Sequence, residues 1–231
     1  MNKNESNLPV RRDRAEALVV DEVDLQRARL YALLGRFLAR PPSRELLAQV
    51  AVLRGSGGGD GPLGRALGEF AELAGSTTEA EAEREYNALF IGVDRGELVP
   101  YASYYLTGFL NDRPLARLRQ DMQALGLERA PGVAEPEDHV AAVCEIMAGL
   151  ITGAFGESPE IGQRRFFERN LGSWAGRFFG DLEQAEAARL YRPLGAVGRL
   201  FLEIEADDWA ATMATTAPAA AGAAPDRMSL A

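Results

Sequence analysis

The stretch that decides the fold is Glu135–Leu150, "EPEDHVAAVCEIMAGL". Its acidic opening gives way to a run that is apolar on nearly every side of a helix, with Glu145 as the only charge inside. A helix of this kind lies at the centre of a fold, because neighbours must cover it from all directions. We therefore predict a buried helix whose stripe is formed by Val140, Val143, Cys144, Met147 and Ile151, extended by Ile146 and Leu150.

The acidic opening predicts where this helix begins. Glu135 stands where a capping residue would stand, and Pro136 would take the first helical position, which tolerates proline. Glu137 and Asp138 would then occupy the first turn, where the helix dipole favours a negative charge by roughly 0.3–1 kcal/mol each. We expect the helix to start at Pro136, just before His139, the only histidine of the chain.

Helical periodicity continues along most of the chain, and no convincing strand alternation is present. Asp21 or Asp24 could cap a first helix that ends before Pro41, and Ser43 could cap a second. Pro193 should kink or split the last helix. We predict an all-α, single-domain bundle of about eight or nine helices. The first starts at Asp21 or Asp24 and runs to about 39, and further helical segments cover 43–53, 63–73, 76–90, 111–126, 136–151, 162–182 and 187–205, with helix or turn over 101–110.

Composition sets the domain limits. Residues 1–20 form an expected flexible segment, 21–206 the helical domain, and 207–231 a low-complexity tail that we expect to be disordered. The glycine-rich stretch Gly55–Gly64 reads as a linker, because it lacks the Gly-Lys-Ser/Thr ending of a phosphate-binding loop.

Charge and cysteine content exclude several functions. The formal net charge of −9 disfavours nucleic-acid binding and favours a cationic ligand or peptide. One cysteine and one histidine allow neither an internal disulfide nor the usual zinc site. No apolar run is long enough for a membrane span, and the N-terminus lacks the apolar core of a secretory signal. We expect a cytoplasmic protein without metal, cofactor, nucleic-acid partner or stable membrane insertion.

Three interpretations of "EPEDH" remain open from the residues alone. The acids could simply favour the start of a helix. Asp138 and His139 could act as an acid–base pair, although adjacent side chains on a helix point about 100° apart. The third interpretation is a binding site, in which carboxylates receive guanidinium groups and apolar walls receive a hydrophobic segment.

A second block, Glu83–Leu106, is rich in aromatic residues and interrupted by glycine and proline. Its aromatic side chains fit either a core or the wall of a peptide groove, since a Pro-Tyr loop between two helices suits a groove. They are Tyr86, Phe90, Tyr101, Tyr104 and Tyr105.

Together the blocks "EYNALFIG…GELVPYASYYL", "EPEDHVAAVCEIMAGL" and "QRRFFERNLGSWAGRFF" resemble the TorD/DmsD/NarJ family of cytoplasmic redox-enzyme maturation chaperones. The resemblance covers about Leu30–Glu205. Its most specific part is the Glu-Pro-x-Asp-His motif that opens a hydrophobic helix. Two positions depart from the pattern: Ala102 stands where an acidic residue is common, and Val93 where a proline often follows the glycine.

The resemblance implies an all-α protein that is not an enzyme. Such chaperones bind the twin-arginine signal peptide, or an equivalent N-terminal segment, of a molybdenum-cofactor oxidoreductase, assist cofactor insertion and delay export. Motif matching assigns signal-peptide binding to Pro100, Tyr101, Ser103, Pro136, Asp138 and His139. Glu135 and Glu137 are added on electrostatic grounds.

The client, such as a formate dehydrogenase, is not fixed by the sequence, and a monomer or a homodimer is equally compatible with it. Two rival hypotheses remain. One is a helical adaptor of the NarJ type that binds a mature region of its partner enzyme. The other is an enzyme centred on His139.

Overall fold

A computed structural model describes residues 20–54, 59–92, 95–129, 135–156 and 160–216. Within these ranges the chain forms ten α-helices and one π-helical turn, η1, and its only β pairings are isolated bridges. The predicted all-α fold is confirmed. The elements are α1 (Glu22–Ala39), α2 (Arg44–Ala51), α3 (Pro62–Ser76), α4 (Glu79–Tyr86), η1 (Asn87–Ile91), α5 (Ala102–Thr107), α6 (Arg113–Ala124), α7 (Val140–Ile151), α8 (Glu160–Asn170), α9 (Ala175–Gln184) and α10 (Tyr191–Thr216).

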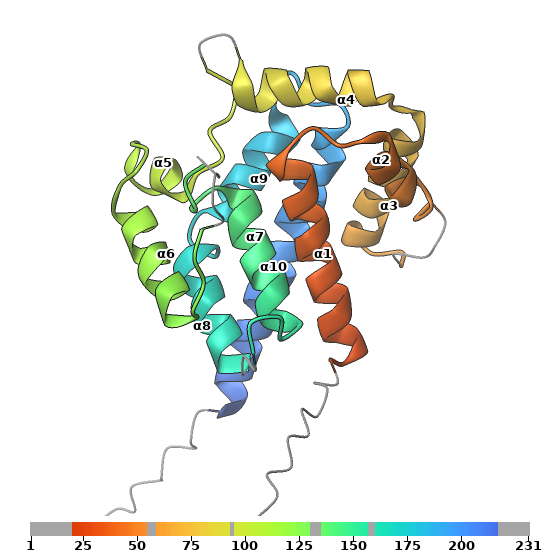
Figure 1. The fold of residues 1–231 in the computed structure, drawn as a ribbon. Helices are drawn as coiled ribbons and strands as arrows, with labels where there is room; N and C mark the ends of the chain where they lie inside the picture. The colour runs from red at the N-terminus through yellow and green to blue at the C-terminus, as the bar shows by residue number, and fades with distance from the viewer. Residues whose placement is uncertain (1–19, 55–58, 93–94, 130–134, 157–159, 217–231) are drawn as a thin grey trace, which may run out of the picture.

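Helix α7 lies at the centre, with α1 beside it and α10 behind (Figure 1). All seven apolar residues of its predicted stripe are buried, which confirms that it is a core helix. Helix α1 approaches α7 closely because Gly35 has no side chain: a Cβ there would lie 3.0 Å from Cγ of Glu145 and 3.3 Å from the carbonyl oxygen of Ala141. Helices α5 and α6 lie on one side of this centre, and α2 and α3 on the other (Figure 1).

Several helices begin where local capping predicts. The Asp21 carboxylate accepts a hydrogen bond from the Asp24 N–H at 2.8 Å, and the Ser43 hydroxyl accepts one from the Leu46 N–H at 3.3 Å. Thr78 and Glu81 form a reciprocal capping box at the start of α4. These starts are decided within three residues of sequence.

Two expectations about the later helices are wrong. The segment 162–182 is broken into α8 and α9 by a turn over 171–174, so the fold has more helices than expected. Pro193 produces no break in α10, because it is the third residue of that helix, where no backbone donor is needed for an intrahelical bond.

The domain boundary expected at 206 falls inside α10, which continues to Thr216. Its last described turns are held by Trp209, whose buried ring lies 5.0 Å from the guanidinium of Arg27. The expected flexible segment, apart from residue 20, lies outside the described residues, as do residues 217–231 of the expected tail and 55–58 of the linker.

Candidate peptide-binding cleft beside the central helix

Helix α7 begins at Val140, so the expectation that Glu135 caps it and Pro136 opens it is wrong. His139 is the N-cap, and its Nδ1 accepts a hydrogen bond from the Ala141 N–H at 3.2 Å. Residues 136–138 instead form a turn closed by the His139 N–H and the Pro136 carbonyl at 3.2 Å. The start is delayed because His139 has extended backbone (φ −63°, ψ 135°) and pairs with Tyr101 in an antiparallel bridge.

This bridge joins the two motifs that the sequence places far apart. The Val140 N–H donates to the Pro100 carbonyl at 2.8 Å, and the Ala102 N–H donates to the Asp138 carbonyl at 3.0 Å. The rings of Tyr101 and His139 meet edge to face with centroids 5.0 Å apart. The "VPYAS" and "EPEDH" segments therefore form one structural unit at the mouth of α7.

Asp138 is buried behind this unit. Its Oδ2 accepts a hydrogen bond from the Ser103 N–H at 2.8 Å, while its Oδ1 has no hydrogen-bond partner in the part of the chain described. Ser103 is also buried, and its hydroxyl accepts a hydrogen bond from the Asp112 N–H at 3.3 Å. Of the eight predicted site residues, these two hold the start of α5 against α7 and do not line the neighbouring cleft.

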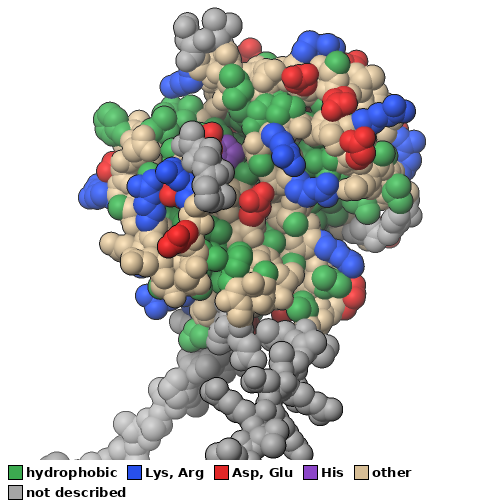
Figure 2. Space-filling view, viewed as in Figure 1, with side chains coloured by type: hydrophobic (Ala, Val, Ile, Leu, Met, Phe, Trp, Pro, Cys, Tyr) green, Lys and Arg blue, Asp and Glu red, His purple; other side chains and the backbone are tan. Residues whose placement is uncertain are grey.

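The other six predicted residues line a cleft of about 460 Å³. Its floor is one face of α7, formed by Ala141, Ala142, Glu145 and Ile146. One wall comes from α4 and η1, with Tyr86, Phe90 and Ile91, and the other from the end of α6 and the loop after it, with Met122, Leu127, Glu128 and Arg129. Figure 2 shows the chain's histidine, in purple, as a small area among hydrophobic side chains on this face.

The charged side chains of the cleft differ in their partners. Burial, the largest single influence, would raise the pKa of Glu137. The Arg119 guanidinium at 2.8 Å, a backbone hydrogen bond and the field of Arg129 at 4.0 Å together outweigh burial and lower that pKa. Glu128, Glu135 and Glu145 make no ion pair or hydrogen bond through their carboxylates with any described residue. Burial lowers the pKa of His139 to about 4, so the imidazole is neutral at pH 7.

This arrangement gives no acid–base pair. The Asp138 carboxylate is directed to Ser103, and the Nδ1 of His139 is occupied by the backbone of α7. Cys144 is fully buried, and burial raises the pKa of its thiol, so it is not an activated nucleophile. Within the described ranges, no three His, Cys, Asp or Glu side chains are grouped to hold a metal ion.

Sequence reasoning missed several residues of this cleft. The alanines and Ile146 of the floor read only as core, and Phe155 carried no signal. Glu145 did carry one, because a single charge inside an otherwise apolar helix must face either a partner or an opening. The π-helical turn that places Phe90 and Ile91 in the wall is the kind of irregularity often found at functional sites.

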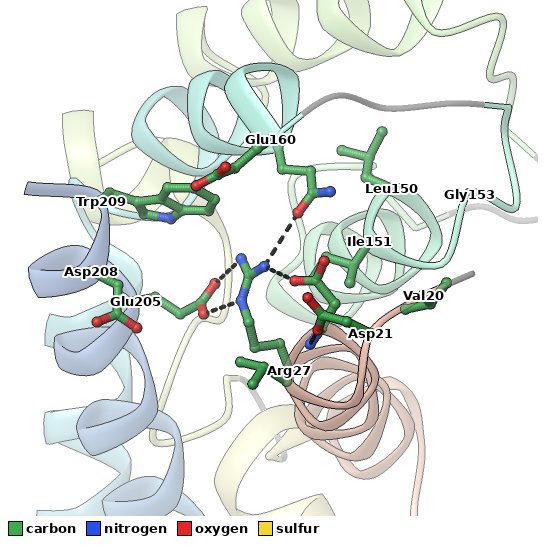
Figure 3. Close-up of a pocket in the computed structure, with 13 residues that line it drawn as sticks. Val20, Asp21, Arg27, Leu150, Ile151, Gly153, Glu160, Glu205, Asp208 and Trp209 are labelled. Carbon is green, nitrogen blue, oxygen red and sulfur yellow. Dashed lines mark hydrogen bonds and ion pairs between the residues drawn. The ribbon is translucent and has the colours of Figure 1, made fainter. Parts of the chain in front are cut away.

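A second pocket, of about 400 Å³, lies between the start of α1, α8 and the far end of α10 (Figure 3). Arg27 fills its centre and donates to both carboxylate oxygens of Glu205, at 2.6 and 2.9 Å, and to Asp24 at 2.5 Å. Tyr31 donates to the same Glu205 carboxylate at 3.0 Å. Because these groups satisfy one another, this network ties the first helix to the last, and we assign it to stability.

Comparison with known proteins places the chain in a family. The sequence profile described as nitrate reductase delta subunit matches residues 58–180, more than half of the chain. The chain belongs to this family. The resemblance to the TorD/DmsD/NarJ group is thereby confirmed.

Two curated relatives are named chaperone protein TorD. That of Vibrio cholerae serotype O1 (strain ATCC 39541) is 28% identical over 133 residues, covering 54% of this chain and 60% of the relative. That of Shewanella pealeana is 24% identical over 210 residues, covering 83% of this chain and 93% of the relative. The chain thus spans only about 60% of the length of the Vibrio relatives it matches.

A crystal structure of a redox enzyme maturation protein from Archaeoglobus fulgidus shares the fold, with a TM-score of 0.53 and 22% identity. It covers 77% of this chain, and the match spans 93% of that protein. Among the helices of the described ranges, none is both long and apolar enough to cross a membrane.

Proposed function

We propose that this protein is a cytoplasmic redox-enzyme maturation chaperone. It binds the twin-arginine signal peptide, or the N-terminal segment, of a molybdenum-cofactor oxidoreductase such as a formate dehydrogenase. While bound, it assists cofactor insertion and delays export. Its family and the names of its relatives support this class of function. The observation that carries the proposal is the cleft itself, where apolar walls surround carboxylates that lack partners among the described residues.

The dimensions of the cleft suit a helical peptide. It extends along α7 from His139 to Ile146, and the ring of Phe155, which also lines it, covers Gly149 beyond that end: a Cβ on Gly149 would lie 2.2 Å from that ring. Along α7 these seven positions span about 10 Å, which is the length of about two turns of a bound helix. An apolar helix lying in a groove is a common mode of peptide recognition.

The floor and rim of the cleft support the same conclusion. Ala141 and Ala142 project little, so a peptide backbone can come close to α7. Large apolar side chains stay accessible at the rim: Ile91 is 58% exposed and Phe155 is 41% exposed. Covering such surface contributes about 25 cal/mol per Å², which supplies most of the affinity for an apolar segment.

Filling the floor tests this proposal. Ala142→Trp places a large side chain in the cleft, and we expect it to weaken binding of the client's leader peptide at least tenfold in calorimetry. Ala48→Trp is the matched control, because Ala48 is exposed on α2, away from the cleft. Equal affinities for the two variants and the wild type would exclude the cleft as the binding site.

One observation favours the rival adaptor function. Phe109 and Leu110, on the turn between α5 and α6, are 73% and 50% exposed, which suits contact with a mature region of a partner enzyme. A pull-down with leader-deleted client separates the two functions. If the wild type still retains the leader-deleted client, and the double variant Phe109→Ser/Leu110→Ser does not, the adaptor function is favoured. If removing the leader abolishes retention by the wild type, binding in the cleft is favoured.

A further inference from the structure

Glu145 is the only charged residue of α7, and it lies at the centre of the cleft floor. It comes six positions after His139, about 9 Å along the helix. Its side-chain stem passes over Gly35 of α1, which leaves no room for another side chain at that point. The position of the stem is therefore set by the packing of the two central helices, while the residue remains exposed within the cleft.

The carboxylate of Glu145 has no hydrogen-bond or ion-pair partner among the described residues. Burial raises its pKa, which shows that the surroundings disfavour the charged form. Arg40 counters this only through its electrostatic field, without an ion pair. A partly desolvated carboxylate without a partner is costly, and a cation docking beside it relieves that cost.

Two acids of the "EPEDH" motif, Glu137 and Asp138, are less available, whereas Glu135 lines the mouth of the cleft without a carboxylate partner among the described residues. Glu137 is already paired with Arg119 and Arg129. Asp138 is only 1% exposed and is directed to Ser103, away from the cleft. Glu135 lies at the mouth of the cleft, in the segment before α7, whereas Glu145 lies on the floor, about two turns further along than Asp138.

The surroundings of Glu145 suit arginine in particular. Ala141 and Ala142, one turn earlier on the same face, leave open space beside the carboxylate. One turn later, the ring of Phe155 takes the place of a side chain on Gly149. A planar guanidinium can donate two parallel hydrogen bonds to a carboxylate and stack on an aromatic ring at the same time, which an ammonium group cannot do equally well.

We propose that Glu145 is the receptor for an arginine side chain of the bound peptide, with Phe155 as the aromatic surface beside it. This inference rests on the proposed function, because it assigns a specificity-determining residue within the same cleft. Apolar contacts along the floor hold the hydrophobic part of the peptide. The Glu145–arginine pair fixes its register and selects leaders that carry arginine.

A double-mutant cycle tests this pairing. The probes are two synthetic peptides that share a ten-residue Leu/Ala-rich segment. In one peptide two adjacent arginines precede this segment. In the other these are replaced by citrulline, which is uncharged but has nearly the same shape. Calorimetry gives the Kd of each peptide for the wild type and for Glu145→Gln. We expect Glu145→Gln to weaken arginine-peptide binding about tenfold or more, and citrulline-peptide binding less than twofold.

Two control variants accompany the cycle. Glu72→Gln removes the same charge from α3, away from the cleft, and should change either affinity less than twofold. Glu145→Asp keeps the charge but withdraws it by one methylene group, so its affinity for the arginine peptide should fall between those of the wild type and Glu145→Gln. Thermal denaturation checks that each variant is folded.

The outcomes separate the two proposals. If the wild type binds both peptides equally well, or if Glu145→Gln binds the arginine peptide as tightly as the wild type, the cleft function stands and the assignment of Glu145 is overturned. If the wild type binds neither these peptides nor a client leader, both proposals are overturned.

Discussion

His139 has a role in the structure that the sequence alone does not indicate. One interpretation of the motif makes His139 half of an acid–base pair, whereas the structure shows an N-cap that is 8% exposed and packed on Tyr101. Its neighbours in the bridge come from a segment far away in sequence, so no local pattern could predict its burial. The resemblance to the family implied that the two motifs bind the same peptide, and the bridge between Tyr101 and His139 brings them together.

Burial of His139 makes stability depend on pH. Its pKa falls from 6.5 to about 4 on folding, so the unfolded state binds more protons between these values. The stabilising contribution of neutral His139 should therefore be fully present above pH 6.5. The free energy of unfolding should decrease by about 3 kcal/mol as the pH falls from there to 4. Urea unfolding of the wild type and His139→Asn at pH 7 and pH 4.5 isolates this contribution, since asparagine also caps helices but does not titrate. Parallel pH profiles for the two proteins would contradict the account.

We expect Asp138 to affect peptide binding indirectly, by holding the start of α5 in place. Asp138→Ala removes the acceptor of the Ser103 N–H, and should cost about 1–3 kcal/mol of stability and weaken leader binding by loosening the start of α5. Asp138→Asn keeps an acceptor, so it should retain leader binding within about threefold. If the folded asparagine variant loses binding as fully as the alanine variant, the carboxylate charge itself contacts the peptide.

At the scale of elements, the sequence predicts what is decided locally. The starts of α1, α2 and α4 follow from side-chain caps within one turn. The start of α7 does not, because the bridge to Tyr101 delays it. The local sequence predicts a helix that Pro193 would break, because it does not reveal that α10 starts only two residues earlier. That start depends on a group from another element.

That group is Glu85 of α4. Its carboxylate accepts hydrogen bonds from three successive N–H groups at the start of α10, those of Arg189, Leu190 and Tyr191, at 2.7, 3.1 and 2.8 Å. Glu85→Ala should lower the free energy of unfolding by about 1–3 kcal/mol, measured by urea denaturation. Glu83→Ala, an exposed position on the same helix, serves as control. Equal stabilities of the two variants would show that this cap contributes nothing.

At the scale of the whole molecule, the first and last helices are joined by the Arg27–Glu205 pair. Glu205→Ala leaves Arg27 without its main partner in a largely buried position, and should cost about 3–5 kcal/mol. The double variant Arg27→Met/Glu205→Met removes both charges and should recover much of that loss. Additive losses in the urea unfolding of the single and double variants would argue against this coupling.

The all-α architecture and the central place of α7 were predictable, because a helix that is apolar on nearly every side must be covered by neighbours all round. The cleft was predictable only in outline. Its floor combines residues that read as core, and its walls come from segments whose meeting depends on the packing of α1 against α7. The eight proposed site residues separate accordingly into six at the cleft and two behind it.

We expect the peptide to lie on the face of α7 from His139 to Ile146, with Phe155 beside it. Photo-cross-linking can map this contact, with a benzoylphenylalanine placed in the apolar segment of a twin-arginine leader and the attachment sites identified by mass spectrometry. We expect cross-links to residues 86–91, 100–101 and 139–155, which excess unlabelled leader abolishes. Competable cross-links confined to α2 and α3, on the other side of the molecule, would contradict it.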